Sequence, residues 1–295
     1  MPPDRKAAAE VVPLFRATPV VDVADEVEVG RTLLRPVAPA IAKDPAIDLT
    51  GKPKVLLAIG PGNVGKTTAL RYIAERAVAS GRETFFAAID PENRELGAYF
   101  EGVHEPPSFE PDAVLTWLER FLAFTIERKV TAAIDMGGGD TSLGRLVASG
   151  ADIVQVAEEA GVTVVALYML SPRLSDLAAL SSLEQAGFLP KATAIVLNEG
   201  RLPDPTVARE EAFARTMQHS AYKAAIKRGA QQLWMPRLIP AKEVEDRRIT
   251  FAQARDAISP AGRSVTPLGP FDRRRVRDWL TRMDAEWSVV QSWLP

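Results

Sequence analysis

The sequence predicts an α/β protein in which helices cover both faces of a doubly wound, mostly parallel sheet. Three observations predict this fold class. From residue 54 onward, predicted strands and helices alternate along the chain, which is the order that produces such a sheet. The predicted strands, such as residues 162–170 (VTVVALYML), are apolar throughout, as is typical of parallel strands buried on both faces. A glycine-rich turn joins the first strand to the first helix.

The first half of the predicted domain begins with a continuous apolar strand at residues 54–60 (KVLLAIG). A helix is expected at 65–80, and Gly81 closes it, because glycine commonly follows the last turn of a helix. The next elements are a strand at 83–90, a helix with apolar residues at helical spacing at 111–129, and a strand at 130–135.

The second half continues the same alternation, and no internal repeat is present. Its predicted strands are residues 162–170, 192–198 and 233–239. Its predicted helices are residues 151–161, 175–187, one long helix at 205–229, and two further helices near 249–258 and 271–292.

The composition excludes several kinds of site. The chain has 295 residues, a formal net charge of -2 and 46% hydrophobic residues, which suits a globular protein with one large domain or two small ones. It has no cysteine, which excludes disulfides and cysteine-bound metals, and only two histidines, His104 and His219. The N-terminus does not resemble a signal peptide, and the longest apolar run is too short to span a bilayer. We therefore expect a cytoplasmic protein.

Residues 1–50 differ from the rest of the chain. Short apolar pieces lie between recurring prolines, which are Pro2, Pro3, Pro13, Pro19, Pro36, Pro39 and Pro45. We expect an arm that is extended or disordered and has little core of its own. The α/β domain with its C-terminal helices is expected at residues 51–295.

The stretch 55–70 (VLLAIGPGNVGKTTAL) satisfies two phosphate-binding motifs. Residues 60–65 fit the dinucleotide fingerprint G-x-G-x-x-G, and residues 60–67 fit the phosphate loop G-x-x-x-x-G-K-[ST] of ATP and GTP enzymes. Lys66 and Thr67 decide between them, because a triphosphate needs a cation at its β- and γ-phosphates and a hydroxyl for Mg²⁺. The helix N-terminus adds N–H donors. The motif therefore predicts binding of a nucleoside triphosphate.

A phosphate loop also needs an acid that holds the metal. Asp135 ends a predicted strand in the stretch TAAIDMGGGD, and a run of glycines at 137–139 follows it. This is the arrangement of a Walker B carboxylate, with a flexible switch that can approach a γ-phosphate. We predict a metal role for Asp135, the alternative being a strand-ending residue in an ordinary loop. Asp140 is expected to cap the next helix.

The order of these elements resembles the ParA/MinD-type ATPases, the deviant-Walker branch of the SIMIBI P-loop NTPases, over about residues 54–260. The resemblance depends on four stretches: GPGNVGKTT (60–68), FFAAIDPENREL (85–96), AAIDMGG (132–138), and AIVLNEG (194–200) together with LIPAKEVEDRRITFAQARDA (238–257). Each stretch after the first is a weak signal alone, so the resemblance depends on their order and spacing.

The resemblance implies a role for each matching residue. Lys66, Asp90 and Asp135 would be catalytic, with Asp90 positioning the attacking water. Thr67 and Asp135 would hold Mg²⁺. Asn198 and the segment after Pro240 would approach the base, with a turn or capping role as the equal alternative for Asn198. The expected nucleotide-binding residues are Gly60, Pro61, Gly62, Asn63, Val64, Gly65, Lys66, Thr67, Thr68, Asn198 and Pro240.

Two departures from the family pattern indicate a divergent member. Pro61 occupies the position of the signature lysine that reaches across an ATP-sandwich dimer, and MGGG at 136–139 replaces the usual Pro-rich turn. With these departures, the sequence resembles mobilisation and conjugation accessory ATPases more than a standard partition ATPase. The resemblance implies an ATP- and Mg²⁺-dependent switch in plasmid partition, conjugal transfer or positioning. Weak hydrolysis and a nucleotide-dependent homodimer are both compatible with it.

Two other functions stay open at this stage. The first is a small-molecule kinase or ligase, for which Asp140, Arg145 and Arg173 could line a substrate site. The second is a binding module that retains the nucleotide without catalysis. The preference for ATP over GTP also stays open.

Positive charge is concentrated near the C-terminal end of the sequence. The stretch FDRRRVRDWLTRM carries Arg273, Arg274, Arg275, Arg277 and Arg282, and an earlier helix carries Lys223, Lys227 and Arg228. The resemblance implies non-specific DNA, or a DNA-binding or relaxosome protein, as a partner. A solvated helix face is the alternative, because Asp272 and Asp278 partly neutralise the cluster.

Overall fold

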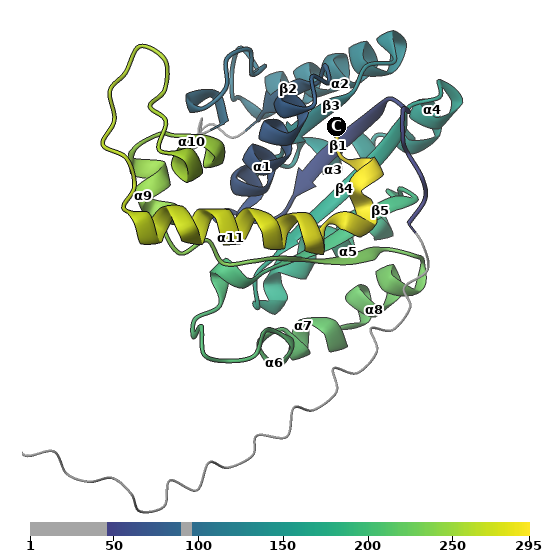
Figure 1. Ribbon diagram of the computed structural model, residues 1–295. Coiled ribbons are helices and arrows are strands. Elements are labelled where there is room, and N and C mark those ends of the chain that lie inside the picture. The colour runs from purple at the N-terminus through teal and green to yellow at the C-terminus, as the bar shows by residue number, and fades with distance from the viewer. Residues whose placement is uncertain (1–45, 90–95) are drawn as a thin grey trace, which may run out of the picture. The chain divides into compact units, whose positions relative to one another are not determined.

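The computed structural model describes residues 46–89 and 96–295. One sheet of six strands, all paired in parallel, has the order β2-β3-β1-β4-β5-β6 (Figure 1). The strands are β1 (Lys54–Ile59), β2 (Phe85–Ala88), β3 (Ala132–Asp135), β4 (Thr163–Leu170), β5 (Ala192–Asn198) and β6 (Gln231–Met235). The predicted fold class is confirmed. Residues 1–45 of the predicted N-terminal arm lie outside the described residues.

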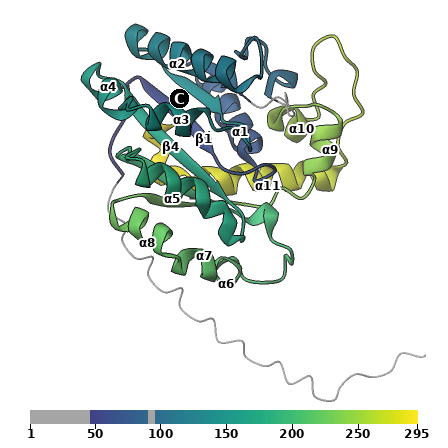
Figure 2. The same ribbon diagram turned by 180° about the vertical axis from the view of Figure 1, so that it is seen from behind.

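Helices cover both faces of the sheet, as the front and back views show (Figures 1 and 2). One face carries α1 (Lys66–Ala79), α9 (Ala241–Asp246), α10 (Phe251–Asp256) and α11 (Pro270–Glu286), with the short helices η1 (Leu96–Ala98) and η4 (Ser288–Trp293). The other face carries α2 (Pro111–Arg128), α3 (Ser142–Ala148), α4 (Ile153–Glu159), α5 (Ala178–Gln185), α6 (Arg209–Ala212), α7 (Ala214–Gln218) and α8 (Ser220–Lys227). Within residues 46–89 and 96–295, none of the helices has both the length and the apolar character needed to cross a membrane.

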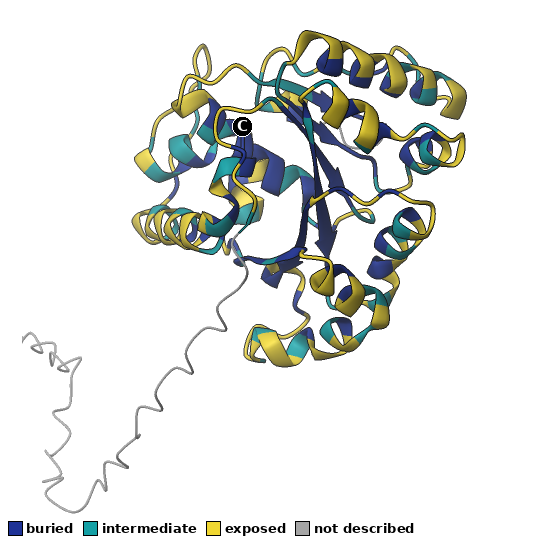
Figure 3. Cartoon of the chain, turned by 90° about the vertical axis from the view of Figure 1, so that its right-hand side faces the viewer, coloured by how far each residue is buried: buried dark blue, intermediate teal, exposed yellow. Residues whose placement is uncertain are grey.

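The sheet separates two hydrophobic cores (Figure 3). Val55 and Leu57 of β1 face the core beneath α2 to α8, whereas Leu56 and Ala58 face the core beneath α1 and α9 to α11. Each of these side chains is at most 1% exposed. This two-sided burial explains why the strand is apolar at every position rather than at alternate ones.

The C-terminal helices belong to the same domain, because three tryptophans attach them to it. Trp279 Nε1 donates to Pro236 O at 2.8 Å, and Trp287 Nε1 donates to Trp234 O at 3.1 Å. Trp293 Nε1 donates to Ile47 O at 2.7 Å. All three rings are at most 2% exposed, so they combine a large buried apolar area with a satisfied N–H donor.

The prediction of one long helix at 205–229 is wrong. The chain forms α6, α7 and α8 in succession, with breaks at Phe213 and His219. Phe213 is fully buried against Trp234, and His219 adopts an extended conformation from which its Nδ1 accepts a hydrogen bond from Ala221 N at 3.2 Å. A straight helix could not place Phe213 in the core and also satisfy the first N–H groups of α8, so tertiary packing overrides local helix propensity.

The C-terminal end of the domain shows two smaller departures. The helix expected at 271–292 is divided into α11 and η4, with Trp287 at the junction. The strand expected at 233–239 is β6 (Gln231–Met235), which ends before Pro236, because proline cannot donate to the next rung of a sheet.

Topology places the carboxyl ends of the six parallel strands at one edge of the sheet. β1 pairs with β3 on one side and β4 on the other. The chain therefore reverses its direction of winding at β1. Ligands in open α/β sheets bind in the crevice outside the strand ends at such a switch point. The loop that follows β1 lies at this position.

Candidate functional site

Residues 60–65 form a tight loop between β1 and α1. Gly60 has φ 152°, Asn63 has φ 59° and Gly65 has φ 99°, values that favour glycine or asparagine. A Cβ atom on Gly60 would lie 2.6 Å from Met169 O in β4. The glycines of the motif are therefore required by the backbone path, which directs the loop over the N-terminus of α1, where free N–H donors favour an anion.

Lys66 is the first residue of α1, and its side chain reaches back over this loop. Lys66 is only 6% exposed. Its Nζ donates to Gly60 O at 3.0 Å and to Pro61 O at 2.9 Å. The ammonium group is therefore held over the hollow of the loop. Because these acceptors are neutral carbonyls, an anionic phosphate would be a stronger partner for the same N–H donors.

Thr67 and Asp135 come together as the sequence predicts. Thr67 Oγ1 donates to Asp135 Oδ2 at 2.8 Å, and Asp135 is 2% exposed. The register of the sheet explains the contact, because Asp135 ends β3 directly beside Ala58 of β1. A hydroxyl and a carboxylate are hard oxygen ligands of the type that Mg²⁺ takes, with waters and phosphates completing its shell. The residues present therefore fit a Mg²⁺–nucleotide group.

The glycine run after β3 is in direct contact with the phosphate loop. A Cβ atom on Gly138 would lie 2.4 Å from Gly62 N and 2.5 Å from its Cα, so only glycine fits there. A Cβ atom on the neighbouring Gly139 would have no heavy atom within 4 Å. Asp140 accepts hydrogen bonds from Ser142 N at 3.1 Å and Ser142 Oγ at 2.7 Å at the start of α3. Asp140 therefore satisfies the first N–H of α3 from one residue before the N-cap, which is Thr141 and makes no side-chain capping bond.

Asn198 supports the phosphate loop from the end of β5. The residue is 3% exposed, its Nδ2 donates to Val64 O at 2.8 Å, and its Oδ1 accepts from Gly200 N at 2.8 Å. A Cβ atom on Gly65 would lie 2.5 Å from Asn198 Nδ2. The bond from Gly200 N is the turn or capping role given above as the alternative, because Asn198 is the N-cap of the short helix Glu199–Arg201. The bond to Val64 O is a supporting role that the motif did not predict, although an asparagine at the carboxyl end of a buried strand was a signal for it. The base contact stays a prediction.

The remaining predicted site residues are distributed around this centre. Pro240 is buried and immediately precedes α9, close to the end of β6, whose Met235 Cε lies 3.5 Å from a Cβ built on Gly65. Thr68 follows Thr67 in the first turn of α1. Asp90 lies outside the described residues, so its predicted role in positioning water stays a prediction.

A hollow of about 500 Å³ lies beside the phosphate loop on the side of Gly138. Its lining includes Pro61, Gly138, Asp140, Arg145, Ser175 and Asp176. Arg145 Nη2 is bonded to Asp112 Oδ1 at 2.6 Å, and Asp176, 4% exposed, accepts from Ser171 N at 2.9 Å. Arg173 does not line the hollow, and its Nε lies 3.3 Å from Ser171 Oγ. The structure thus brings Asp140 and Arg145 to one cavity but leaves Arg173 outside it.

The predicted basic residues do not form one patch. The arginines of α11 and the basic residues of α8 lie on helices that cover opposite faces of the sheet. Several of the α11 arginines are paired: Arg274 with Asp278 at 2.9 Å, Arg275 with Asp272 at 2.7 Å, and Arg282 with Glu199 at 2.9 Å. These pairs, of which the one to the buried Glu199 is partly shielded from solvent, reduce the charge that the helix presents to a polyanion.

The parallel sheet, the phosphate loop between β1 and α1, and an acid at the end of neighbouring β3 agree with the predicted P-loop NTPase fold class. No protein-family model matches the sequence, and no curated protein matches it.

Solved structures of FtsY proteins are similar to this chain. FtsY from Thermotoga maritima has 15% identity and a TM-score of 0.43, covering 65% of this chain and 64% of its own. The signal recognition particle receptor FtsY from Elizabethkingia anophelis, in complex with GDP, has 14% identity and a TM-score of 0.39, covering 63% of this chain and 58% of its own. The chain thus spans less than two thirds of these two proteins. These values do not assign it to a family.

Proposed function

We propose that this protein is a nucleotide-dependent switch of the ParA/MinD type, which binds ATP with Mg²⁺ and hydrolyses it. The observation that carries the proposal is the contact between Thr67 Oγ1 and Asp135 Oδ2 at 2.8 Å, beside a lysine held in the loop. A hydroxyl, a buried carboxylate and a cation at one helix N-terminus are the groups that a Mg²⁺–triphosphate requires.

Each of these groups has a distinct task in the proposed mechanism. The N–H groups of the loop and the Lys66 ammonium bind the β- and γ-phosphates, and Lys66 exchanges the carbonyls of Gly60 and Pro61 for phosphate oxygens. Thr67 and Asp135 hold Mg²⁺, which neutralises charge that develops on the phosphates when it is bound. Asp90 orients the attacking water.

The contact of Gly138 with Gly62 supports the switching part of the proposal. Because the glycine run touches the loop that would hold the phosphates, a change in the γ-phosphate would move residues 137–139 first. The displacement would pass to α3 through Asp140 and Ser142, which are hydrogen bonded to each other. In many nucleotide switches, contact with the γ-phosphate orders a segment of this kind, and hydrolysis releases it.

The environment of Glu199 supports adenine over guanine. Guanine presents two adjacent N–H donors on its pairing edge, and a carboxylate is the acceptor that suits them. Glu199 directly follows Asn198, but its Oε1 accepts from Arg209 at 2.8 Å and its Oε2 from Arg282 at 2.9 Å. Both oxygens are therefore engaged in ion pairs.

The proposed setting is cytoplasmic plasmid partition, conjugal transfer or positioning, with DNA or a DNA-bound protein as the partner. The support on α11 is limited to Arg273 and Arg277, which form no ion pair within residues 46–89 and 96–295, whereas Arg274, Arg275 and Arg282 are paired. Pro61 in place of the signature lysine implies that any nucleotide-dependent dimer uses another cation across its interface. The hollow of about 500 Å³ beside Gly138 favours a small-molecule kinase or ligase as the second candidate, since it could hold an acceptor near the γ-phosphate.

Calorimetric titration with ATP, GTP and Mg²⁺ tests the proposal. Lys66→Ala should weaken ATP binding by at least about 100-fold, because it removes the charged donor at the phosphates. Lys227→Ala, an exposed lysine of α8, is the matched control and should leave affinity unchanged. Equal affinity of parent and Lys66→Ala would contradict the phosphate-loop assignment, and tighter binding of GTP would contradict the assignment to ATP.

Phosphate release and light scattering separate the candidate functions. The switch predicts phosphate release from ATP and a change in molecular mass or partner binding with a non-hydrolysable analogue. The kinase predicts phosphoryl transfer to a small-molecule acceptor instead of to water. Tight ATP binding with no release and no transfer would leave a binding module.

A further inference from the structure

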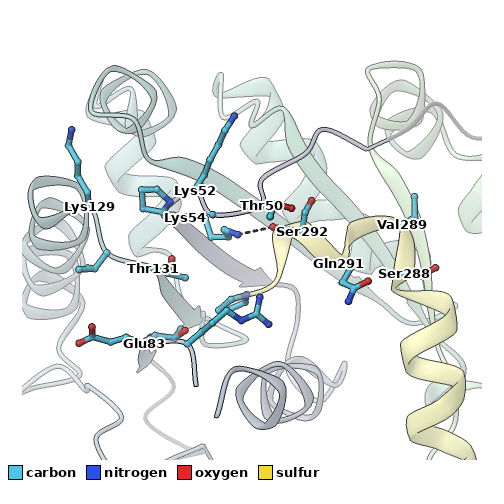
Figure 4. A pocket seen from close by; sticks show the side chains of 16 residues that line it. Thr50, Lys52, Lys54, Glu83, Lys129, Thr131, Ser288, Val289, Gln291 and Ser292 are labelled. Carbon is cyan, nitrogen blue, oxygen red and sulfur yellow. Dashed lines mark hydrogen bonds between the residues drawn. The ribbon is translucent and has the colours of Figure 1, made fainter. Parts of the chain in front are cut away.

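A second pocket lies at the opposite edge of the sheet, where β1, β2 and β3 begin. It has a volume of about 750 Å³. Four segments contribute to it: residues 50–54 before β1, residues 82–84 before β2, residues 129–131 before β3, and residues from η4 and the segment after it (Figure 4). β1 begins at Lys54 and ends beside the phosphate loop, so six residues of strand, about 20 Å, separate the two sites.

The lining of this pocket is strongly basic. Its charged side chains are Lys52, Lys54, Arg82 and Lys129 against a single carboxylate, Glu83. Figure 4 shows Lys52 and Lys129 extending in the same direction from different loops, while Glu83 points away from Lys54. The domain as a whole has no such excess, because the chain carries a formal net charge of -2. The four cations of the lining therefore outnumber its one carboxylate side chain, and Asp48, which is not a lining residue, places a second negative charge near Lys52 and Lys54.

Two of the four cations are held by neutral acceptors, which are backbone carbonyls for Lys54 and a serine hydroxyl for Arg82. Lys54 is 5% exposed, and its Nζ donates to Leu49 O at 3.0 Å and Ser292 O at 2.7 Å. Arg82 Nε donates to Ser80 Oγ at 2.7 Å. Neutral acceptors hold these groups without cancelling their charge, so an anion in the pocket would meet preorganised cations.

The other two cations are available to a ligand, and one buried hydroxyl on the same lining lacks a hydrogen-bond partner among the described residues. Lys52 and Lys129 are exposed and form no ion pair within residues 46–89 and 96–295. Thr84 Oγ1, on the same lining, is buried and has no hydrogen-bond partner among the described residues. Buried polar atoms are normally satisfied, and Thr84 Oγ1 has almost no accessible surface, so a ligand in the pocket reaches it only when the lining moves aside.

We propose that this pocket binds a soluble anion carrying two or more phosphate groups. The positive groups come from three loops and therefore suit several separated negative charges rather than one. The described lining contains no aromatic side chain on which a nucleobase could stack, so the phosphates and not a base provide recognition. The proposal does not depend on the proposed switch function, because it uses none of the phosphate-loop residues.

The test measures tripolyphosphate binding by calorimetry at low salt in the Lys66→Ala background, which removes the contribution of the phosphate loop. We expect saturable binding of one equivalent. Lys52→Gln with Lys129→Gln should weaken it at least tenfold and reduce its salt dependence. Lys223→Gln with Lys227→Gln, two exposed lysines outside the pocket, is the matched control and should bind as the background does.

A second variant addresses the orphan hydroxyl. Thr84→Val keeps the shape of the side chain but removes the donor, so it should weaken tripolyphosphate binding by several-fold without lowering the thermal midpoint. Absence of saturable binding below 1 mM, on the order of −4 kcal/mol, would overturn the proposal. Binding that the double Lys52/Lys129 substitution leaves unchanged, or binding of an acidic peptide in place of tripolyphosphate, would also overturn it.

Discussion

The two edges of the sheet present two different ways of attracting phosphate. At the carboxyl edge, a single loop of contiguous residues supplies backbone N–H groups around one lysine, and glycine at two positions, Gly60 and Gly65, makes the path possible. At the amino edge, side chains from separate loops supply the charge. The first arrangement depends on backbone geometry and tolerates almost no substitution. The second depends on the summed charge of several side chains, so its affinity should fall gradually as single cations are substituted.

The largest effect is expected for Gly138→Ala, which tests the geometric site. The added Cβ would lie 2.4 Å from Gly62 N, so either the phosphate loop or the glycine run must move. We expect single-turnover ATP hydrolysis to fall by at least about 100-fold, as for loss of a positioned transition-state contact. Gly139→Ala is the matched control, because its Cβ would meet open space. Equal rates for the two variants would contradict a role for this contact.

The next largest effect is expected for Asn198→Ala. Loss of its bonds to Val64 O and Gly200 N leaves buried polar groups unsatisfied, at a cost of about 1–3 kcal/mol in the free energy of unfolding. Chemical denaturation measures this loss.

The same variant separates a supporting role of Asn198 from a base contact. In a Lys52→Gln, Lys129→Gln background, which weakens the amino-edge site, affinity for ATP and for tripolyphosphate should fall by the same factor if the side chain only supports the phosphate loop. A loss confined to ATP would assign Asn198 to the base and contradict the supporting role as its main contribution to binding.

The two edges also differ in how far the sequence predicts them. Lys66, Thr67 and Asp135 were identified from spacing, because a local motif and the register of neighbouring strands fix their geometry. The contact of Asn198 with the loop and that of Gly138 with Gly62 depend on how strand ends meet in space, which no local pattern specifies. The amino-edge pocket is lined by residues more than 200 positions apart in the sequence. None of these residues belongs to a local motif, so the sequence alone does not indicate that they meet.

The predicted elements show the same division. Strands and helices with continuous apolar patterns, such as β4 and α2, were predicted within a few residues. The region 205–229 was not, because Phe213 is drawn into the core beside Trp234 and breaks a sequence whose local propensity is helical. Packing decided this region, and packing depends on residues distant in the sequence.

A smaller effect is expected from the arginines of α11, which extend the comparison to a third basic surface. Arg273→Ala, Arg274→Ala and Arg275→Ala together should flatten the salt dependence of non-specific DNA binding by about one unit per lost phosphate contact. Because Arg274 and Arg275 are paired with Asp278 and Asp272, we expect a change below the full three contacts.

Fluorescence anisotropy with ATP present, over a series of salt concentrations, measures this change. The exposed arginines Arg120 and Arg128 of α2 provide a control substitution. Absence of DNA binding at low salt would identify α11 as a solvated helix face and would favour a protein as the partner.

The smallest effect concerns Lys54 and sharpens the contrast between a buried lysine at each edge. Burial, helped by the charge of Arg82 and opposed by Asp48, lowers the pKa of Lys54 from 10.5 to about 8. Between pH 8 and 10 the unfolded chain therefore keeps a proton that the folded chain has released. Stability rises with pH wherever the unfolded state binds more protons, by at most about 1.4 kcal/mol per pH unit.

Lys54→Met removes this ionisation and fills similar space, so urea unfolding of parent and variant from pH 7 to 9.5 isolates it. The variant also loses the bonds to Leu49 O and Ser292 O, which shifts its whole curve downward by a pH-independent amount. The free energy of unfolding of the parent, minus that of the variant, should therefore increase as the pH rises above 8. Parallel curves would show that Lys54 keeps an ordinary pKa, and that its charge is stabilised by the two carbonyls as effectively as by water.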